Sequence, residues 1–319
     1  MKILIFGAGV IGSIVGWQLQ GRNDVTHFVK SDKLSDYNEH GICIDVCDLR
    51  KNDSKISSHL YQPNFIDSLD NISEYDVLLL SVKSNQLIDV IQQYQDEFNK
   101  IPIFIMQNVG LNDYNDITHL LSHNVSFLYP FIMGGGRVGN KINCTIFNSF
   151  MNSMVIGNLD NAKKDVEIAI YDELKHCQLH PTFSKDIKAY LKLHYVWATC
   201  SLASYIHSGN YDNFSKIHNI QDSYKAMLEC FAVFKKEGID SKKIFPYNIY
   251  HLPSFILAIS TQMLYKTEAM KIMIMGHINS SPDEMESMYD SLYEYCQDNL
   301  DNMPIFKSYK VAIDNHFKR

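Results

Sequence analysis

The sequence predicts an α/β fold: an N-terminal Rossmann-type dinucleotide-binding domain followed by a mainly α-helical C-terminal domain. Three observations predict it. Residues 2–6 form an apolar run that leads directly into a glycine-rich turn. Strand-like and helix-like segments then alternate up to about residue 130. After about Asp186, apolar residues recur at spacings of three and four, as in amphipathic helices. The 319 residues are enough for two domains, which we expect at 1–185 and 186–319.

The first half contains five strand-like runs. A strand buried on both faces is a continuous apolar run, so we expect parallel strands joined by right-handed crossovers. The expected strands are residues 2–6, 25–29, 76–82, 101–106 and 125–129, and the expected helices are residues 10–19 and 87–98. Residues 134–139 are expected to be a flexible or tightly turning segment, with short strands following at 143–148 and 153–156.

The composition argues against several classes of partner. The net charge is −7, whereas nucleic-acid binding usually needs a concentrated basic face. No apolar run is long enough to span a membrane. The seven cysteines are scattered without a CxxC pair, and no signal peptide precedes the first strand, so we expect reduced thiols and a cytoplasmic protein. His176, Cys177 and His180 have a spacing like that of a metal site, but no second ligand pair lies nearby, so no metal is expected.

The turn after the first strand has the spacing GxGxxG. It consists of Gly7, Ala8, Gly9, Val10, Ile11 and Gly12. The first glycine permits the tight turn, the second lets the backbone approach a pyrophosphate, and the third allows close packing of helix on strand. The following helix offers free N–H groups and the positive end of its dipole to phosphates. We therefore expect these six residues to bind a dinucleotide.

Basic residues at the ends of two strands favour NADP over NAD. Lys30 and Ser31 follow the second strand, where NAD enzymes usually place an acid for the ribose hydroxyls. Lys83 follows the third strand, and ligands of open α/β sheets bind beyond the carboxyl ends of strands. The competing interpretation uses Asp32 as the ribose acid and makes the protein NAD-dependent.

An amide follows the fourth strand at the same expected edge. Asn108, in the pair Gln107-Asn108, offers both donors and an acceptor. Such a side chain could contact a carbonyl, a nicotinamide ribose or a catalytic amine.

Taken in order, these motifs resemble the ketopantoate reductase (2-dehydropantoate 2-reductase) family over nearly the whole chain. The resemblance rests on GAGVIG after the first strand, V-K-S-x-Q after the third, Q-N after the fourth, and a helical second half. It implies NADPH-dependent reduction of a 2-oxo acid, with ketopantoate as the expected substrate in pantothenate and coenzyme A biosynthesis. It also implies that basic side chains contact the NADP 2′-phosphate, and it leaves a homodimer open.

The resemblance implies roles for three further side chains. Lys192 matches the family's catalytic lysine, which would donate a proton to the developing alkoxide or stabilise it. Glu268, in a T-E motif, would bind a substrate hydroxyl and position the lysine. Asn108 matches the asparagine that contacts this region. Lys188 lies one helical turn before Lys192 and is an alternative for the interior lysine.

The substrate positions depart from the family pattern. Asn210 and Ser254 are expected to bind substrate, with Ser260 an alternative for the serine. The family has asparagines one and two turns after the catalytic lysine, where this chain has Val196 and Cys200. A site without those amides no longer matches a polar substrate well. This leaves two alternatives: a reductase of the same fold for another 2-oxo acid, and a non-catalytic NADPH-binding sensor.

Overall fold

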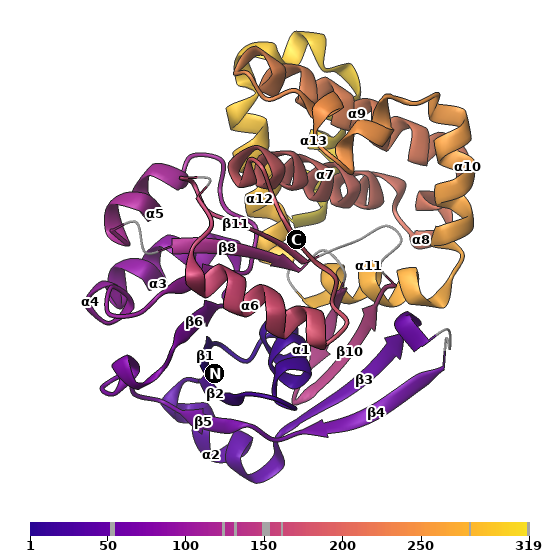
Figure 1. Cartoon of the computed structure of the whole chain (residues 1–319). Helices are drawn as coiled ribbons and strands as arrows, with labels where there is room; N and C mark the ends of the chain where they lie inside the picture. The colour runs from indigo at the N-terminus through magenta and orange to yellow at the C-terminus, as the bar shows by residue number, and fades with distance from the viewer. Residues whose placement is uncertain are drawn as a thin grey trace. The chain divides into compact units, whose positions relative to one another are not determined.

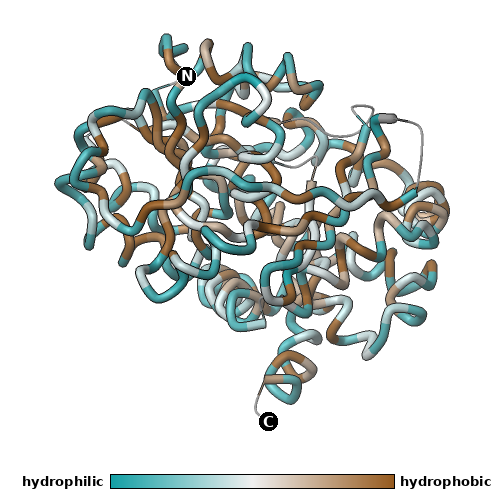
Figure 2. Tube along the Cα trace, turned by 90° about the horizontal axis from the view of Figure 1, so that it is seen from below, coloured by the Kyte–Doolittle hydropathy of each residue, from teal (hydrophilic) through white to brown (hydrophobic). Residues whose placement is uncertain are grey.

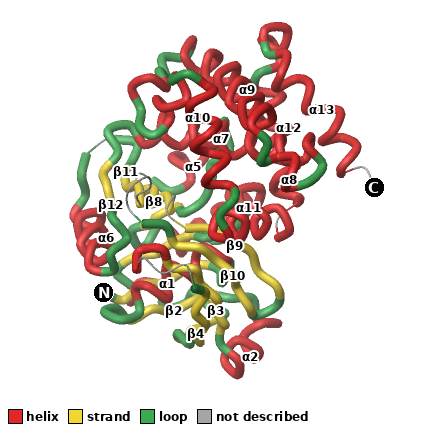
Figure 3. Tube along the Cα trace, turned by 90° about the vertical axis from the view of Figure 1, so that its right-hand side faces the viewer, coloured by secondary structure: helices red, strands yellow, loops and turns green. Residues whose placement is uncertain are grey.

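The computed structural model of the chain describes residues 1–51, 55–122, 125–130, 133–148, 154–160, 162–280 and 282–317. It divides into two compact units, in which the elements carry the labels of Figure 1. Unit 1 comprises Met1–Asn108, Asn112–Lys188 and Ile272–Ser280; unit 2 comprises Val109–Leu111, Ala189–Lys271 and Ser281–Arg319. Every strand of the described residues belongs to unit 1, whereas unit 2 is helical (Figure 3). The predicted fold class is confirmed.

The larger sheet of unit 1 has eight strands in the order β12-β11-β8-β7-β6-β1-β2-β5. Their bounds are β1 (Lys2–Phe6), β2 (Asp24–Phe28), β5 (Asn64–Ile66), β6 (Val77–Leu80), β7 (Ile103–Ile105), β8 (Val125–Pro130), β11 (Met154–Gly157) and β12 (Pro181–Phe183). All neighbours pair in parallel except β8 and β11. Every residue of β6 and β7 is buried, which explains their continuous apolar runs. Of the strand expected at 153–156, Ser153 lies outside the described residues.

A second, four-stranded sheet was not expected. Its order is β4-β3-β10-β9, with β3 parallel to β10 and the other pairs antiparallel. The strands are β3 (Ile42–Asp48), β4 (Ile56–Tyr61), β9 (Met133–Val138) and β10 (Lys141–Ile146). Buried and half-buried residues alternate over the first part of β3, the period-two pattern of a strand with one more deeply buried face.

The glycine run at 134–136 lies within β9, so the expectation of a flexible or tightly turning segment is wrong there. The physical reason is close packing rather than turning. A Cβ on Gly136 would lie 2.6 Å from the carbonyl O of Gly276, in α11 (Glu268–Ser280). A side chain on the strand would push the helix away, and glycine is therefore required at this contact.

The helices of unit 1 include the one that opens at the glycine-rich turn. They are α1 (Val10–Leu19), α2 (Ser31–His40), α3 (Leu87–Gln93), α4 (Gln95–Phe98), α5 (Tyr114–Leu120) and α6 (Asp165–His176), with short 3-10 helices η1 (Leu49–Lys51), η2 (Ile72–Glu74) and η3 (Ser84–Gln86). The helix expected at 87–98 is interrupted at Tyr94, which leaves the helical conformation. Its ring packs 5.2 Å from that of Phe6 and 5.7 Å from that of Phe28.

Unit 2 consists of helices around α9. They are α7 (Ile187–Ser208), α8 (Tyr211–Phe214), α9 (Ile217–Lys236), α10 (Ser254–Tyr265), α12 (Pro282–Tyr295) and α13 (Pro304–Phe317), with the first residues of α11 and the 3-10 helices η4 (Ser241–Lys243), η5 (Tyr247–His251) and η6 (Gln297–Asn302). Hydrophobic and hydrophilic residues alternate along the helical coils (Figure 2). In α9, the predicted apolar positions Met227, Cys230, Phe231 and Phe234 are all buried, and the helix packs on α10 and α13.

A buried histidine lies beneath the glycine-rich turn of unit 1. His27 of β2 is fully buried, and its Nδ1 lies 2.8 Å from the carbonyl O of Gly7. Because a carbonyl can only accept, Nδ1 carries the proton, and Nε2 accepts the hydroxyl hydrogen of Tyr61 at 2.9 Å. Gly16 leaves room for the pair, since a Cβ there would lie 2.8 Å from Nε2. Burial lowers the pKa of His27 from 6.5 to about 4, and the positive charge of Arg137 acts in the same direction.

We expect His27 to make the free energy of unfolding depend on pH between about pH 6.5 and pH 4. The unfolded chain takes up this proton near pH 6.5 and the folded chain only near pH 4, so the contribution of neutral His27 is present above pH 6.5 and falls as the pH is lowered, by about 3 kcal/mol across the window. Urea unfolding at pH 7 and at pH 4.5 measures the change. His27→Gln is the control, because glutamine keeps a donor and an acceptor but does not titrate. An equal loss of stability in both proteins would contradict the assignment.

Candidate functional site

The glycine-rich turn begins where β1 ends. Gly7 has a φ of +98°, which L side chains rarely adopt, and a Cβ there would lie 2.7 Å from the carbonyl O of Ser81. At Gly12, in α1, a Cβ would lie 3.1 Å from side-chain atoms of Ile5 and Ser81. The first and third glycines therefore allow the tight turn and the close approach of the helix to the sheet.

Gly9 meets neither of these needs. Its φ is −69°, which suits any residue, and among the described residues no atom lies within 4 Å of a Cβ built there, its immediate chain neighbours aside. It is the N-cap residue of α1, whose first turn presents unpaired N–H groups and the positive end of the helix dipole. A side chain at Gly9 would occupy only the open space in front of this turn. A glycine here is therefore explained by a ligand that approaches the backbone, as a pyrophosphate does.

The two predicted lysines follow strands on either side of β1. Lys30 follows β2 and Lys83 follows β6, and these strands run parallel to β1, so both residues lie at the sheet edge that carries the glycine turn. Lys30 is exposed and Lys83 half-buried. The alternative ribose acid, Asp32, is 69% exposed in the first turn of α2, with its carboxylate 3.9 Å from the ammonium of Lys33. This edge is therefore rich in positive charge.

Gln107 and Asn108 follow β7, the next strand along the same edge. The side-chain N and O of Gln107 are both buried, and neither has a hydrogen-bond partner among the described residues. A buried amide without partners costs free energy, so this side chain suits a ligand that supplies a donor and an acceptor. The sequence favours Asn108 of this pair, whereas the partnerless amide of Gln107 is evident only from the structure.

Arg137 of β9 brings an unpredicted cation to the glycine turn. Its guanidinium donates hydrogen bonds to the carbonyl O of Ala8 and, at 2.6 Å, to the hydroxyl of Tyr37 in α2. Its Nε donates to the carbonyl O of Gly139 at 2.7 Å. Arg137 is 129 residues from Ala8 in the sequence. Only the pairing of β9 in the unexpected second sheet brings the two together, so no spacing could have revealed the contact.

Lys192, the expected catalytic lysine, is held by aromatic and acidic groups within unit 2. It is 7% exposed, and its Nζ donates to the Tyr295 hydroxyl at 3.1 Å and lies 3.5 Å from the carboxylate of Glu237. The Tyr295 hydroxyl in turn donates to Glu237 at 2.5 Å, and burial together with this bond raises the pKa of Tyr295. The ammonium lies over the stacked rings of Phe234 and Tyr295.

The residues one and two turns after Lys192 lie in the interior of unit 2. Val196 and Cys200 are both fully buried, and the Cys200 sulfur lies 3.9 Å from that of Cys230 in α9. Lys192, Val196 and Cys200 share one face of α7. Lys192 contacts Phe234 of α9, the C-cap residue Glu237 and Tyr295 of α12, and Cys200 contacts α9. Val196 and Cys200 therefore contribute to helix packing in the interior of unit 2.

The other predicted substrate residues lie around the start of α11 and α10. The Tyr211 hydroxyl, next to Asn210 in sequence, donates to the carbonyl O of Tyr265 at 2.7 Å, three residues before Glu268. Burial, and to a lesser extent the charge of Glu268, raises the pKa of Tyr211 to about 12. Asn210 caps α8, its Oδ1 accepting a 2.9 Å bond from the N–H three residues on. Ser254 opens α10 and accepts a 3.3 Å bond from a glutamine of α9. Glu237, not an expected residue, is the acid found beside Lys192.

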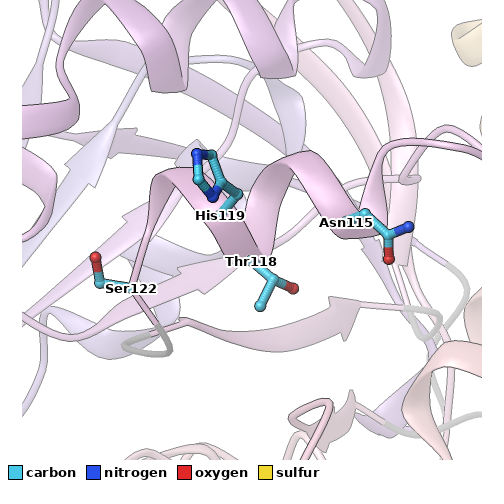
Figure 4. Close-up of a pocket in the computed structure, with 4 residues that line it drawn as sticks. All are labelled: Asn115, Thr118, His119 and Ser122. Atoms are coloured by element: carbon cyan, nitrogen blue, oxygen red, sulfur yellow. The ribbon is translucent and has the colours of Figure 1, made fainter.

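A hollow of the surface belongs to unit 1. Asn115, Thr118, His119 and Ser122 line it, on α5 and the turn that follows (Figure 4). These are not strand-end residues, and we assign the hollow no role. Within the described part of the chain, no group of three or more His, Cys, Asp or Glu side chains could hold a metal ion. No described helix is both long and apolar enough to cross a membrane.

Comparison with solved structures finds the same fold in several dehydrogenases and reductases. D-mandelate dehydrogenase in a ternary complex with NADH and anilino(oxo)acetate has a TM-score of 0.74 and 16% identity, covering 99% of this chain and 98% of that chain. The 2-dehydropantoate 2-reductase from Methylococcus capsulatus has a TM-score of 0.69 and 17% identity, covering 98% and 96%. That from Geobacter metallireducens GS-15 has a TM-score of 0.70 and 13% identity, covering 99% and 100%.

Comparison with curated protein sequences finds no match. Comparison with protein families does: the family described as ketopantoate reductase PanE/ApbA matches residues 3–166, which is more than half of the chain. The matched span contains the glycine-rich turn and the ends of β2, β6 and β7. The chain therefore belongs to the ketopantoate reductase family, whose members are NAD(P)-dependent oxidoreductases that act on 2-oxo acids.

Proposed function

We propose that the protein reduces a 2-oxo acid with NADPH, and that this acid is 2-dehydropantoate (ketopantoate), reduced to pantoate for pantothenate and coenzyme A biosynthesis. The observation that carries the cofactor half of the proposal is Gly9, a glycine that neither the backbone conformation nor the packing requires. Family membership supports the reaction class. The solved 2-dehydropantoate 2-reductases of the same fold support the choice of substrate.

The positive charge at the sheet edge supports NADPH rather than NADH. Lys30 and Lys83 would face the 2′-phosphate of the adenosine ribose, where NAD enzymes place an acid. The nearest acid in sequence, Asp32, is exposed and lies beside Lys33, which weakens it as a ribose ligand. The glycine turn, Gly7 to Gly12, would hold the pyrophosphate.

We assign cofactor binding to residues 1–185 and substrate binding with proton transfer to residues 186–319. The partner would be a small 2-oxo acid, and a homodimer is compatible with the proposal. The cysteines are expected to work as thiols in a reducing compartment, the cytoplasm.

Bound NADPH would supply a hydride to C2 of the oxo acid. Lys192 would give a proton to the alkoxide oxygen that forms there, so that hydride and proton together produce the 2-hydroxy acid. The hydrogen-bond chain from Lys192 through Tyr295 to Glu237 offers a way to restore that proton, because the Glu237 side chain is 40% exposed to solvent. The buried surroundings of the ammonium would strengthen its attraction to the alkoxide.

Amide, hydroxyl and carboxylate groups would orient the substrate. Glu268 would accept a hydrogen bond from a substrate hydroxyl, and Asn210 and Ser254 would bind its oxygens. Asn108, at the carboxyl edge of the sheet, would contact the nicotinamide ribose or the substrate carbonyl. The amide of Gln107 fits the carboxamide of nicotinamide, because its N and O are buried and lack partners among the described residues.

A less polar 2-oxo acid is the second candidate substrate. The specific observation is that Val196 and Cys200 replace the amides of the family pattern. The fold is shared with a D-mandelate dehydrogenase whose structure contains anilino(oxo)acetate, an aromatic 2-oxo acid derivative. The third candidate is a non-catalytic NADPH sensor, and only Val196 and Cys200 support it.

Replacing the proposed proton donor should slow turnover strongly without weakening cofactor binding. We expect Lys192→Met to lower kcat by about 10²–10⁴-fold, which is the usual rate contribution of general acid catalysis. The Kd for NADPH, from the quenching of its fluorescence, should stay within about threefold, since the glycine turn is untouched. Stopped-flow oxidation of bound NADPH by ketopantoate measures the chemical step.

Lys188→Met is the matched control, because Lys188 lies one turn earlier and its ammonium packs over the ring of Tyr114. It should retain turnover within a few-fold. Near-normal turnover of Lys192→Met would show that the lysine only fills the aromatic cluster. If His194→Gln were then inactive, the role would pass to His194, a buried ring 3.1 Å from the Tyr247 hydroxyl.

The substrate can be decided by steady-state kinetics on a panel of 2-oxo acids. We expect kcat/KM for ketopantoate to exceed that for benzoylformate and for pyruvate by at least about tenfold, because hydrogen bonds to the substrate's hydroxyl are lost with either of the others. A preference for benzoylformate would favour the less polar candidate. NADPH binding without oxidation by any acid would favour the sensor and contradict both reductases.

A further inference from the structure

We propose that Arg137 contacts a phosphate group of the bound dinucleotide and thereby completes the cofactor site from the second sheet. This inference rests on the proposed function, because it takes the glycine turn as the cofactor site. Its physical basis is a half-buried guanidinium beside that turn whose charge is not balanced by the groups that hold it.

The partners of Arg137 are all neutral. They are the carbonyl O atoms of Ala8 and Gly139, the hydroxyl of Tyr37 and, at 3.5 Å, Oδ1 of Asn140. Across the described ranges, no carboxylate lies within 4.0 Å of this guanidinium as an ion-pair partner. Taking part of a charge out of water costs free energy that a nearby anion offsets, so this guanidinium would stabilise an anion bound beside it.

The contacts of Arg137 place its positive charge where a bound dinucleotide would have its negatively charged phosphates. Ala8 belongs to the turn after β1, immediately before the N-terminal end of α1, where pyrophosphates bind. Tyr37 belongs to α2, which begins directly after Lys30. Arg137 therefore bridges the segments that follow β1 and β2. The adenosine half of a dinucleotide lies between these segments in Rossmann domains.

The guanidinium is also held in place before any ligand binds. Its carbon lies 5.3 Å from the centre of the Tyr37 ring, which restricts its movement. Asn140, in the turn between β9 and β10, donates a 2.7 Å hydrogen bond to Asp36 of α2 and so ties this hairpin to the helix. A fixed planar donor set suits the oxygens of a phosphate.

Two phosphates could be the partner, and NADPH and NADH distinguish them. The pyrophosphate is common to both cofactors, whereas the adenosine 2′-phosphate is present only in NADPH. We expect Arg137→Gln to raise the Kd for NADPH at least tenfold, as fluorescence titration would show. An unchanged Kd for NADH would identify the 2′-phosphate, and an equal loss for both would identify the pyrophosphate. Glutamine keeps a donor for the carbonyl of Ala8 but removes the charge.

Lys141→Gln is the matched control, because it removes the same charge from the adjacent strand β10, where Lys141 pairs with Asp45 at 2.6 Å. Its Kd values should stay within about twofold of wild type. Arg137→Lys should recover part of the lost affinity, and Arg137→Gln should reduce the dependence of Kd on salt concentration, because a charge contact with phosphate is screened by salt.

The proposal is overturned if Arg137→Gln binds both cofactors within twofold of wild type. It is also overturned if Arg137→Lys binds as weakly as Arg137→Gln and the salt dependence is unchanged, because Arg137 would then only support the turn. Failure of the wild-type protein to bind either cofactor would instead refute the proposed function, so the two failures are distinguishable.

Discussion

The hydrogen bond from the His27 imidazole to the carbonyl O of Gly7 holds the turn on which the proposed cofactor site depends. The turn needs a positive φ at Gly7, and the buried ring anchors its carbonyl at 2.8 Å. The second ring nitrogen accepts a hydrogen bond from Tyr61 of β4, so the second sheet supports the turn through His27. Because the ring is fully buried, its charged form is unfavourable, and this lowers the pKa of His27.

The second sheet acts on the same turn from another direction through Arg137. Tyr61 ends β4 and Arg137 lies in β9, so the two edge strands of this sheet each contribute one contact. The glycine run of β9 permits its close contact with α11, and β9 also packs on α1. The four-stranded sheet thus acts as a support that positions a donor and a cation around the glycine turn.

The sequence alone predicts the proposed site residues that lie close together in the chain or directly after a strand. Gly7, Gly9 and Gly12 are close in the chain, and Lys30 and Lys83 follow continuous apolar strands, so the edge of the sheet could be predicted. Contacts between residues that are far apart in the sequence could not be predicted. Arg137 reaches the turn, and Tyr61 reaches His27 beside it, only through strand pairing. The acid beside Lys192 comes from the end of α9. The glycines of β9 were misinterpreted because close packing and turning require the same residue.

Binding of a dinucleotide at the glycine turn, which we propose, is tested most directly by Gly9→Ala. Alanine suits the backbone at this position, and no described atom beyond the adjoining residues lies within 4 Å of its methyl group, so the free energy of unfolding should change by less than about 0.5 kcal/mol. The Kd for NADPH should nevertheless rise at least tenfold, because the methyl group enters the space of the pyrophosphate. Unchanged NADPH affinity in a stably folded Gly9→Ala protein would contradict the account.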